Sequence, residues 1–551
     1  MCREPVTAPA SARDARAVRH TPRVAVLVPM VAVALGLAMA ASACTGHPSG
    51  HAQVSRPPVS PPASSAAPAV SSPAPLPAPR PRAAFDAVAV ADGSTPSQIS
   101  VAVSRALFAS SPVVVVTSPD QVSVTTAAAD AEALGVPLLL AAPPGSPAAS
   151  GAASDAASDV VDGSDAVDDE VRRLGCVDAL VVGEAPAPER VKIADDVDSL
   201  PPVSKPTPLT GTTVLVHAGG DVGAVAATAT ARAAGATVVP VRGVDPRADP
   251  RAIQQLAAVA STQVLAVGAD FGPAGTLASR VAVAHAGAQL PGGGQLIFPG
   301  RRFVALYGHP GGAGLGVLGA QDADASVARA QQMAAQYQPL SEVPVVPTFE
   351  IIATVAQASA GRDGDYSGES TIAELEPWVA KASAAGLYVV LDLQPGRADV
   401  LAQAKIYAPL LELPNVGLAI DPEWALKPNQ LPLHQIGSID AAVINGVTAW
   451  LDAFTAARHL PQKLVVLHQF RLSMIGDESK LKTDYDNLAL LIHMDGQGAQ
   501  PSKNATWRAV VAAAPKGVPF GWKNFYKEDD PVLTPEQTMA HDPKPMMISY
   551  Q

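Results

Sequence analysis

The C-terminal half of the chain alternates short apolar runs with segments that have the spacing of amphipathic helices. Eight apolar runs occupy residues 303–307, 348–353, 387–392, 416–421, 464–470, 488–493, 518–523 and 546–550. Helical patterns separate most of them, at residues 326–337, 371–385, 398–411, 438–458 and 503–514. Eight strands that alternate with helices over about 250 residues are typical of a (β/α)8 barrel. The usual final helix has no room after the eighth run, so we expect it to be absent or replaced, with residues 274–287 as one candidate.

The region before the barrel also alternates apolar runs with helical patterns. The runs are β-branched or Leu-rich and occupy residues 113–117, 136–141, 179–183, 214–217, 238–241 and 263–268. Helical patterns lie at residues 125–134, 167–174 and 224–234. Continuous apolar strands that alternate with helices indicate a parallel sheet covered on both faces. The predicted fold class is therefore α/β, with a parallel, doubly wound, Rossmann-like domain at residues 83–300 followed by a TIM-like barrel at residues 301–551.

The first 82 residues have the composition of a secretory leader followed by a linker. Residues 1–43 join a basic start to an uncharged run, as in a signal peptide. The sequence Ala41-Ser42-Ala43-Cys44 resembles a bacterial lipobox, which implies lipidation of Cys44 and anchoring at the extracellular face of the cytoplasmic membrane. A plain cleaved signal and a retained membrane anchor are the alternatives. Residues 44–82 are rich in Pro, Ala and Ser and predict a semi-rigid linker.

Charge and cysteine content narrow the possible partners. The 551 residues carry a net charge of −12, which argues against a nucleic-acid partner because phosphate binding needs a basic face. Of the three cysteines, Cys2 lies in the leader and Cys44 in the lipobox, so Cys176 has no partner for an internal disulfide. The glycine-rich loop at residues 219–223 lacks a full G-x-G-x-x-G and predicts a tight turn. No residue pattern predicts a cofactor.

Polar side chains follow nearly every apolar run of the barrel region. The active site of such a barrel lies at the carboxyl ends of its strands. Charged groups are rarely buried without partners, so we expect the polar ends to converge on one binding or catalytic site. The predicted substrate-binding residues are His309, Glu350, Asp392, Trp424, His468, His493, Asp495, Lys523 and Tyr550. Asp399 and Asp440 have the sequence context of helix N-caps instead.

The predicted catalytic pair is Asp421 and Glu423, which follow the fourth run. Period-2 strand geometry puts both carboxyls on one side of the chain, and Leu418, Ile420 and Trp424 on the other. Two neighbouring carboxyls push their pKa values apart, which is what an acid/base pair needs.

The first α/β region resembles a known family of surface proteins over residues 97–190. The segments 113–120, 135–140, 173–175 and 180–183, with an Ala-rich helix between the first two, resemble the cell wall-binding repeat 2 family of Gram-positive bacteria. The resemblance covers about one repeat and implies affinity for wall polymers. The Arg-Tyr pair that usually starts the repeat has no counterpart at residues 98–106.

The fourth run resembles the D-G-x-D-x-D-x-E motif of family 18 glycoside hydrolases. Only the final D-x-E matches, as Asp421-Pro422-Glu423, while Val416 and Ala419 stand at the first two Asp positions. The resemblance implies that Glu423 donates a proton to the glycosidic oxygen and that Asp421 assists it. As a whole, residues 303–551 are similar to a group of actinobacterial lipoproteins without an assigned activity.

Three functions are compatible with these patterns. The first is a glycoside hydrolase-like barrel that acts on cell-envelope polysaccharide through Glu423 and Asp421. In that case sugar rings are expected to stack on Trp424, Trp522, Tyr307 and Phe525. The second is a metal-dependent hydrolase, although its potential ligands lack H-x-H or H-x-x-E-H spacing: they are His309, Asp392, His468, His493 and Asp495. The third is a non-catalytic surface protein whose barrel binds a ligand at its polar rim.

Overall fold

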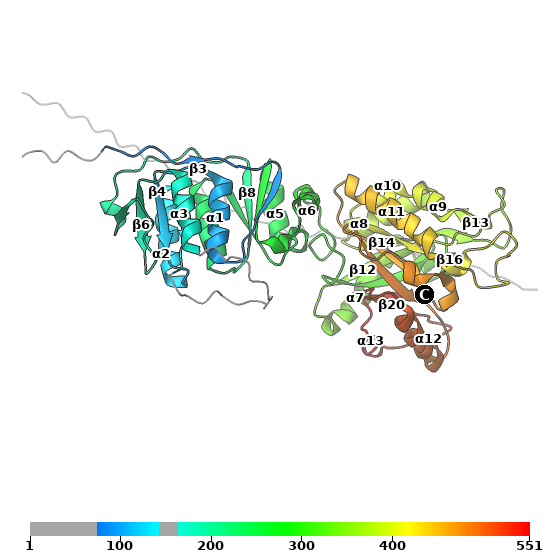
Figure 1. The fold of residues 1–551 in the computed structure, drawn as a ribbon. Helices are drawn as coiled ribbons and strands as arrows, with labels where there is room; N and C mark the ends of the chain where they lie inside the picture. Colours follow the sequence, from blue (N-terminus) through cyan, green and yellow to red (C-terminus); the bar gives the residue numbers. More distant parts are fainter. Residues whose placement is uncertain (1–73, 143–162) are drawn as a thin grey trace, which may run out of the picture. The chain divides into compact units, whose positions relative to one another are not determined.

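The computed structural model describes residues 74–142 and 163–551, which form an α/β region followed by a closed barrel (Figure 1). The predicted signal peptide, Cys44 and the linker as far as residue 73 lie outside the described residues. Within the described ranges, no helix has both the length and the apolar character needed to cross a membrane. Signal cleavage and lipid anchoring therefore stay predictions.

The α/β region contains two four-stranded parallel sheets instead of the single sheet that the pattern predicted. The strand orders are β2-β10-β8-β9 and β5-β4-β6-β7. Two short antiparallel strands, β1 (Arg80–Pro81) and β3 (Phe108–Ser110), pair with each other. The strands of the two sheets are β2 (Val88–Ala91), β4 (Val113–Thr117), β5 (Leu138–Leu140), β6 (Asp178–Val182), β7 (Lys192–Ala194), β8 (Thr212–His217), β9 (Thr237–Val241) and β10 (Gln263–Val267).

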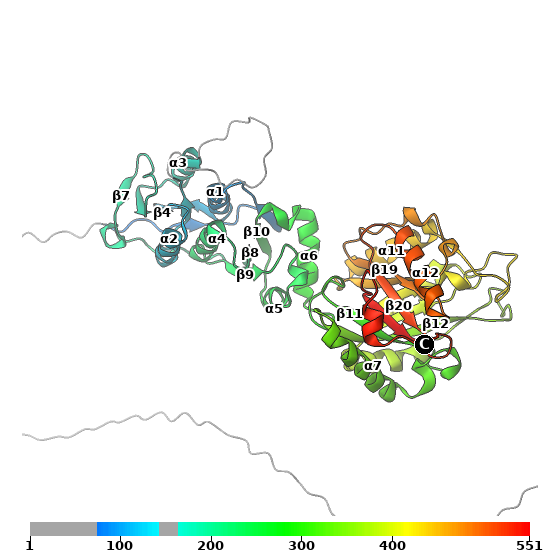
Figure 2. The ribbon, with the colours of Figure 1, turned by 90° about the horizontal axis from the view of Figure 1, so that it is seen from below.

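Helices α1 (Pro96–Leu107) and α4 (Val222–Ala233) lie between the two sheets (Figure 2). Their hydroxyl groups bond to the backbone of β5: the Leu138 N–H donates to Thr230 Oγ1 at 3.0 Å, and the Leu140 N–H donates to Ser100 Oγ at 3.0 Å. These bonds occupy the free edge of β5, where another strand would otherwise pair. The edge contacts explain why the strands divide into two sheets. The other helices of this region are α2 (Gln121–Leu134), α3 (Gly163–Leu174), α5 (Pro250–Ala258) and α6 (Ala274–Ala286).

The barrel closes through eight parallel strands, and all eight were predicted. The strands follow one another around the ring, with β11 paired to both β12 and β21. They are β11 (Arg302–Gly308), β12 (Val345–Ala356), β14 (Tyr388–Leu393), β15 (Val416–Ile420), β17 (Lys463–His468), β19 (Leu488–Met494), β20 (Phe520–Asn524) and β21 (Met547–Tyr550). The main helices between them are α7 (Ala323–Tyr337), α8 (Ile372–Ala384), α9 (Val400–Ile406), α10 (Ala408–Leu411), α11 (Ala441–Ala457), α12 (Gln500–Ala513) and α13 (Pro535–Met539). A short strand, β13 (Ser367–Glu369), pairs antiparallel with β12.

Alternate strand residues fill the lower part of the barrel with an apolar layer. This layer has a crowded point at Gly417, where a Cβ would lie 2.4 Å from the Leu464 carbonyl oxygen and 2.9 Å from the Tyr388 hydroxyl oxygen. Tyr388 therefore fills space that only a glycine leaves open. The layer consists of Leu290, Ile297, Phe303, Ala305, Val346, Tyr388, Val390, Ala419, Leu464, Val466, Leu491 and Met547.

Helix α6 does not replace the final helix of the barrel, so that candidate was wrong. Its buried residues Leu277, Val281 and Ala284 pack in one cluster with residues of β8, β9 and β10. The outer face of β21 is covered instead by α7, where the Tyr337 and Tyr550 hydroxyls lie 2.6 Å apart. The periodic pattern predicted the helix but carries no information about the sheet on which it packs.

A buried ion pair links two loops at the upper end of the barrel. Lys503 of α12 donates to Asp529 Oδ2 at 2.6 Å and to the Lys523 carbonyl at 2.7 Å. The same carboxylate accepts the N–H of Phe525 at 2.9 Å, and its other oxygen accepts the N–H of Gly498 at 3.0 Å. Asp529 thus joins the loop after β19 to the loop after β20.

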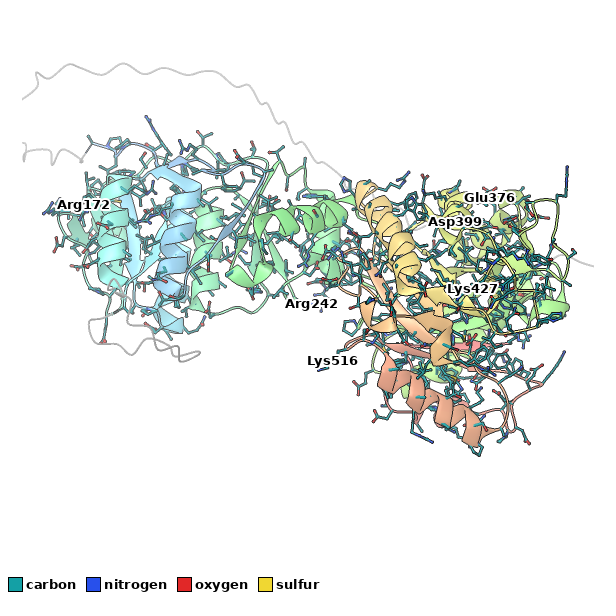
Figure 3. The ribbon with its side chains drawn as sticks, turned by 45° about the vertical axis from the view of Figure 1, so that its right-hand side comes forward. Arg172, Arg242, Glu376, Asp399, Lys427 and Lys516 are labelled. Atoms are coloured by element: carbon teal, nitrogen blue, oxygen red, sulfur yellow. The ribbon has the colours of Figure 1, made fainter. Side chains whose placement is uncertain are left out.

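Replacing Lys503 should destabilise the barrel. In Lys503→Met the charge of Asp529 stays buried without its cation, and we expect a loss of about 3–5 kcal/mol in the free energy of unfolding. Tryptophan fluorescence during urea unfolding measures this, because all five tryptophans lie in the barrel: Trp378, Trp424, Trp450, Trp507 and Trp522. Lys516→Met, at an exposed lysine (Figure 3), is the control and should change little. Equal stability of the two variants would contradict the role of the ion pair.

Candidate functional site

A layer of polar side chains lies above the apolar layer, with one buried residue from or just after each of the eight barrel strands. These positions continue the inward-facing alternation of each strand. All eight are at most 3% exposed. The protonation state of each titratable group among them therefore depends more on its neighbours than on solvent. In strand order they are Tyr307, Glu350, Asp392, Asp421, His468, His493, Lys523 and Ser549.

His468 lies between two carboxylates in this layer. Its Nε2 is 2.9 Å from Glu350 Oε1 and its Nδ1 is 2.9 Å from Asp495 Oδ2. Burial opposes a charge on the ring, but the carboxylates of Glu350 and Asp495 outweigh it and raise the pKa of His468 well above its usual range. His468 is therefore an imidazolium at neutral pH, and both ring nitrogens donate.

The charge of His468 keeps Asp495 ionised. Burial alone would raise the pKa of the Asp495 carboxyl, yet the attraction and the hydrogen bond of His468, together with the charge of Lys523, lower it below its usual value. Asp495 Oδ1 is buried and has no hydrogen-bond partner among the described residues. Asp495 thus offers one unused carboxylate oxygen.

A second histidine of the layer stays neutral. Burial, and after it the charges of His468 and Lys523, lower the pKa of His493 well below its usual value. Its ring stacks on that of His468 with the centroids 5.4 Å apart, and its Nε2 lies 2.9 Å from Ser549 Oγ. A Cβ on Gly521 would come 3.0 Å from the His493 ring, so a glycine gives the ring its room.

Tyr307, Asp392 and Lys523 form a second group in the layer, and Asp392 Oδ1 lies 3.9 Å from His468 Nε2. The Tyr307 hydroxyl donates to Asp392 Oδ2 at 2.9 Å and accepts from Gln394 Nε2 at 3.2 Å. The Lys523 ammonium lies 3.4 Å from the centre of the Tyr307 ring. Burial raises the pKa of Asp392 to about 6, with the charge of His468 acting against that rise.

The predicted pair Asp421 and Glu423 lies at the mouth of the barrel. The strand ends at Ile420, and Pro422–Trp424 forms a 3-10 turn in which the Glu423 N–H donates to Asp421 Oδ1 at 3.0 Å. Burial, and after it the charge of Asp495, raise the pKa of Glu423 to about 7. Burial also raises the pKa of Asp421 well above its usual value.

The mouth forms a cavity of about 650 Å³, within the range of about 300–1,000 Å³ that is usual for small-molecule sites. Asp421, Glu423 and Asp495 supply its carboxyl groups, and Lys523 and Arg471 its cations. Trp424 lines the same cavity, so the prediction that it faces away from the two carboxyls was wrong. The reason is the turn, because the period-2 alternation stops where the strand stops. The apolar and aromatic walls include Leu315, Ile352, Val355, Leu433, Phe470 and Phe525.

Two residues of the predicted set lie elsewhere. Tyr550 points away from the barrel interior and bonds to Tyr337, while its neighbour Ser549 faces inward. The half-buried His309 ring bonds to Ser370 Oγ at 3.0 Å and to the Gly311 N–H at 2.9 Å, and it does not line the cavity. Asp399, as expected, is the N-cap of α9; it is exposed, as are Glu376 and Lys427 (Figure 3).

Of the four aromatic residues predicted to stack on sugar rings, Tyr307, Trp424 and Phe525 line the cavity, whereas Trp522 is fully buried and does not. The sequence prediction missed Ser549 in the buried layer, and Phe470 and Arg471 on the cavity wall. Strand alternation could have identified Ser549, which is two residues after the inward-facing Met547. The loop residues Phe470 and Arg471 carry no such signal.

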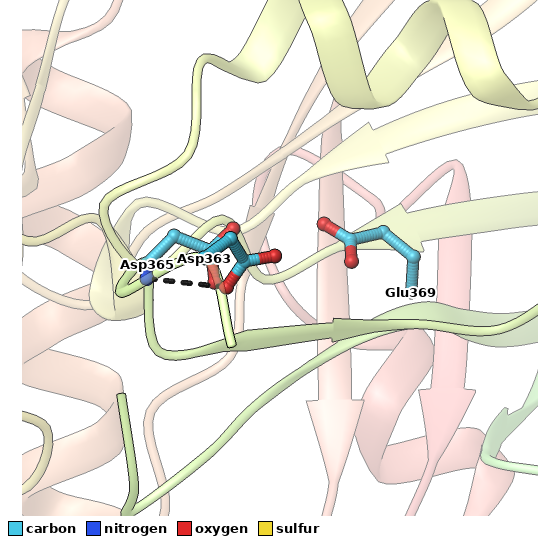
Figure 4. Close-up of side chains that lie close together, drawn as sticks. All are labelled: Asp363, Asp365 and Glu369. Atoms are coloured by element: carbon cyan, nitrogen blue, oxygen red, sulfur yellow. Dashed lines mark hydrogen bonds between the residues drawn. The ribbon is translucent and has the colours of Figure 1, made fainter. Parts of the chain in front are cut away.

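Metal ligation by His468 would require it to give up a carboxylate, because both ring nitrogens already bond to Glu350 and Asp495. Among the residues that the structure describes, one group of three carboxylates has its oxygens within 4.8 Å of one another: Asp363, Asp365 and Glu369 (Figure 4). Such oxygen ligands suit Ca²⁺ or Mg²⁺. The group lies in and beside an exposed loop next to β13, outside the barrel cavity, and by itself it assigns no metal.

Comparisons with known proteins add little to this description. No family model matches the chain, and no curated protein matches it. A solved structure, Cwp6 from Clostridium difficile, matches with a TM-score of 0.27 and 11% identity, over 56% of this chain and 63% of that chain. The chain thus spans less than two thirds of the length of that structure. Similarity at this level carries no argument about fold or function.

Glu423→Gln should make the barrel more stable at high pH. The pKa of Glu423 rises from 4.5 in the unfolded chain to about 7 in the fold. The protonated carboxyl therefore stabilises the fold fully below pH 4.5, and this stabilisation is lost as the pH rises through about 7. Glutamine does not ionise, so at pH 8 we expect a gain on the order of 1–3 kcal/mol over the wild type. Thermal unfolding at pH 4.5 and pH 8 measures the difference. The exposed Glu376→Gln is the matched control, and an equal gain in that variant would refute the assignment.

Proposed function

We propose that the barrel hydrolyses glycosidic bonds in cell-envelope polysaccharide, with Glu423 as the general acid. One observation carries the proposal: Glu423 and Asp495 line the same cavity, and their pKa values are shifted in opposite directions. At neutral pH a large share of Glu423 therefore holds a proton, while Asp495 is ionised. Two carboxyl groups with opposite protonation are what glycoside hydrolysis requires.

The chemistry follows from these two protonation states. Glu423 gives its proton to the glycosidic oxygen as the bond from that oxygen to the anomeric carbon breaks. Asp495 either takes a proton from the attacking water or attacks the anomeric carbon directly. In both cases water supplies the hydroxyl of the new reducing end, and its remaining proton returns to the carboxyl pair. The anomeric configuration of the product, measured by NMR, distinguishes the two routes.

Asp421 has a different role here from the one that the family 18 resemblance implied. Burial raises the pKa of its carboxyl well above the usual value, which favours the protonated form and opposes a negative charge beside Glu423. Its Oδ1 accepts the Glu423 N–H and thereby holds the turn that carries the acid. Asp421 is thus a positioning residue, and the ionised partner is Asp495.

The envelope as the place of action rests on the first 190 residues. The leader, the lipobox-like Cys44 and the Pro-rich linker lead to secretion and surface attachment, and residues 97–190 resemble a wall-binding repeat. A protein attached at the cell surface is next to the polysaccharide of the wall. Trp424, Phe470 and Phe525 give the cavity flat apolar surfaces of the kind against which sugar rings pack.

Purified protein should release new reducing ends from envelope polysaccharide. Glu423→Gln and Asp495→Asn should each lower the rate by about a hundredfold or more, since each removes one half of the acid/base pair. The wild-type rate should fall above a pH of about 7 as Glu423 loses its proton. Reducing-end assays over a panel of wall glycans measure both effects. Glycan binding without turnover would favour the non-catalytic alternative. The absence of both binding and turnover would refute the proposal.

His468→Gln should move the acidic limb of the pH–rate profile to higher pH. The imidazolium keeps the pKa of Asp495 low, so its removal lets Asp495 take up a proton at a higher pH and narrows the active range. The alkaline limb, which Glu423 sets, should move less. Profiles of kcat/KM for the wild type and the variant provide the measurement. A uniform loss of rate without a shift of the acidic limb would mean that His468 has only a structural role.

A further inference from the structure

The cavity that holds Glu423 adjoins a second, smaller hollow. The first has a volume of about 650 Å³ and the second about 330 Å³. Four residues line both hollows: Glu423, Trp424, Leu433 and Arg471. The two spaces therefore meet along a shared wall, and Glu423 is part of it.

The second hollow is formed by a loop whose two ends are fixed by backbone hydrogen bonds. Residues 426–436, between the 3-10 turn and α11, provide most of its wall. The two ends of this loop are fixed: the Leu426 N–H donates to the Gly396 carbonyl at 2.7 Å, and the Gly437 N–H donates to the Glu423 carbonyl at 2.7 Å. A Cβ on Gly437 would lie 2.4–2.6 Å from three carbonyl oxygens of residues 422–425, so the close return of the loop needs a glycine.

The wall between the hollows has the chemistry that sugar rings bind. Trp424 offers a flat apolar surface to both sides. Leu433 is 81% exposed and has a backbone φ of 64°, a strained conformation for a leucine, and its apolar side chain lines both hollows together with Trp424. Arg471 makes no ion pair with any described residue, so its guanidinium is available to sugar hydroxyls or an acidic substituent.

We infer that the substrate is a polysaccharide chain that occupies both hollows and is cut at an internal linkage beside Glu423. A general acid acts on the oxygen between two sugar units, so an acid on a dividing wall cuts a chain that extends to either side. A substrate held only by the larger cavity would leave Trp424, Leu433 and Arg471 with one face unused. The inference rests on the proposed function and specifies it as endo-acting.

Binding measurements with chains of graded length test this inference without requiring turnover. The probes are oligosaccharides of about two to eight sugar units, made by partial acid hydrolysis of Gram-positive wall polysaccharides. Titration calorimetry uses Glu423→Gln, which is not expected to cut them. We expect the affinity to rise by about tenfold or more from the shortest to the longest chain, as further units enter the second hollow. Affinity that does not change with chain length overturns the inference and leaves the proposed function standing.

A variant that fills only the second hollow sharpens the test. Ile436 lines that hollow and not the larger cavity, so Ile436→Trp should lower the affinity for the longest chains by about tenfold and leave the shortest within about twofold. Leu431 is on the same loop, is exposed and lines neither hollow, so Leu431→Trp is the matched control. Equal effects of the two substitutions would overturn the assignment.

The product pattern separates failure of the inference from failure of the proposed function. Wild-type protein acting on long chains should first release fragments of many sizes, as size-exclusion chromatography will show. Release of single sugars from chain ends would keep the hydrolase and overturn internal cleavage. No binding of any chain length together with no new reducing ends would overturn both.

Discussion

The imidazolium of His468, held between Glu350 and Asp495, sets the charge of the groups around it. It is fully buried, so its field acts through a medium of low dielectric and is little screened. The field keeps Asp495 ionised, and it adds to the effect of burial in lowering the pKa of His493. At Asp421 and Glu423, burial outweighs the attraction of the cation and raises the pKa values. The cation at Asp495 and burial at Glu423 thus divide these carboxyls into a base and an acid.

The barrel separates the layer that stabilises it from the layer that carries its chemistry. The lower layer is apolar and closely packed, with Gly417 giving room to Tyr388. Such packing holds the backbone of each strand and so fixes where the next inward side chain points. The polar layer therefore has its geometry set from below. The Lys503–Asp529 ion pair performs a similar task above it, because it joins two of the loops that border the cavity.

Glu423 combines a stability cost with its proposed role. A carboxyl on the wall of a partly closed cavity is less stable when ionised, and the same effect keeps its proton available near neutral pH. Glu423 lies between two hollows, so sugar units on both sides of it would place a glycosidic oxygen beside its proton. The proposed chemistry and the proposed specificity thus depend on the same turn, which Asp421 holds through the Glu423 N–H.

The sequence by itself determined the α/β class, the eight barrel strands and most of the polar residues at their ends, because hydrophobic periodicity and chain order are local properties. It also contained the signal for Ser549, which alternation places on the same face of the strand as Met547, although the prediction chose its neighbour Tyr550. Tertiary structure alone decided that the first region forms two sheets, that α6 packs on the α/β region, and that Trp424 lines the same cavity as Asp421. It also decided the protonation states, since a pKa depends on burial and on charges that lie far apart in the chain, such as Glu350 and Asp495 around His468.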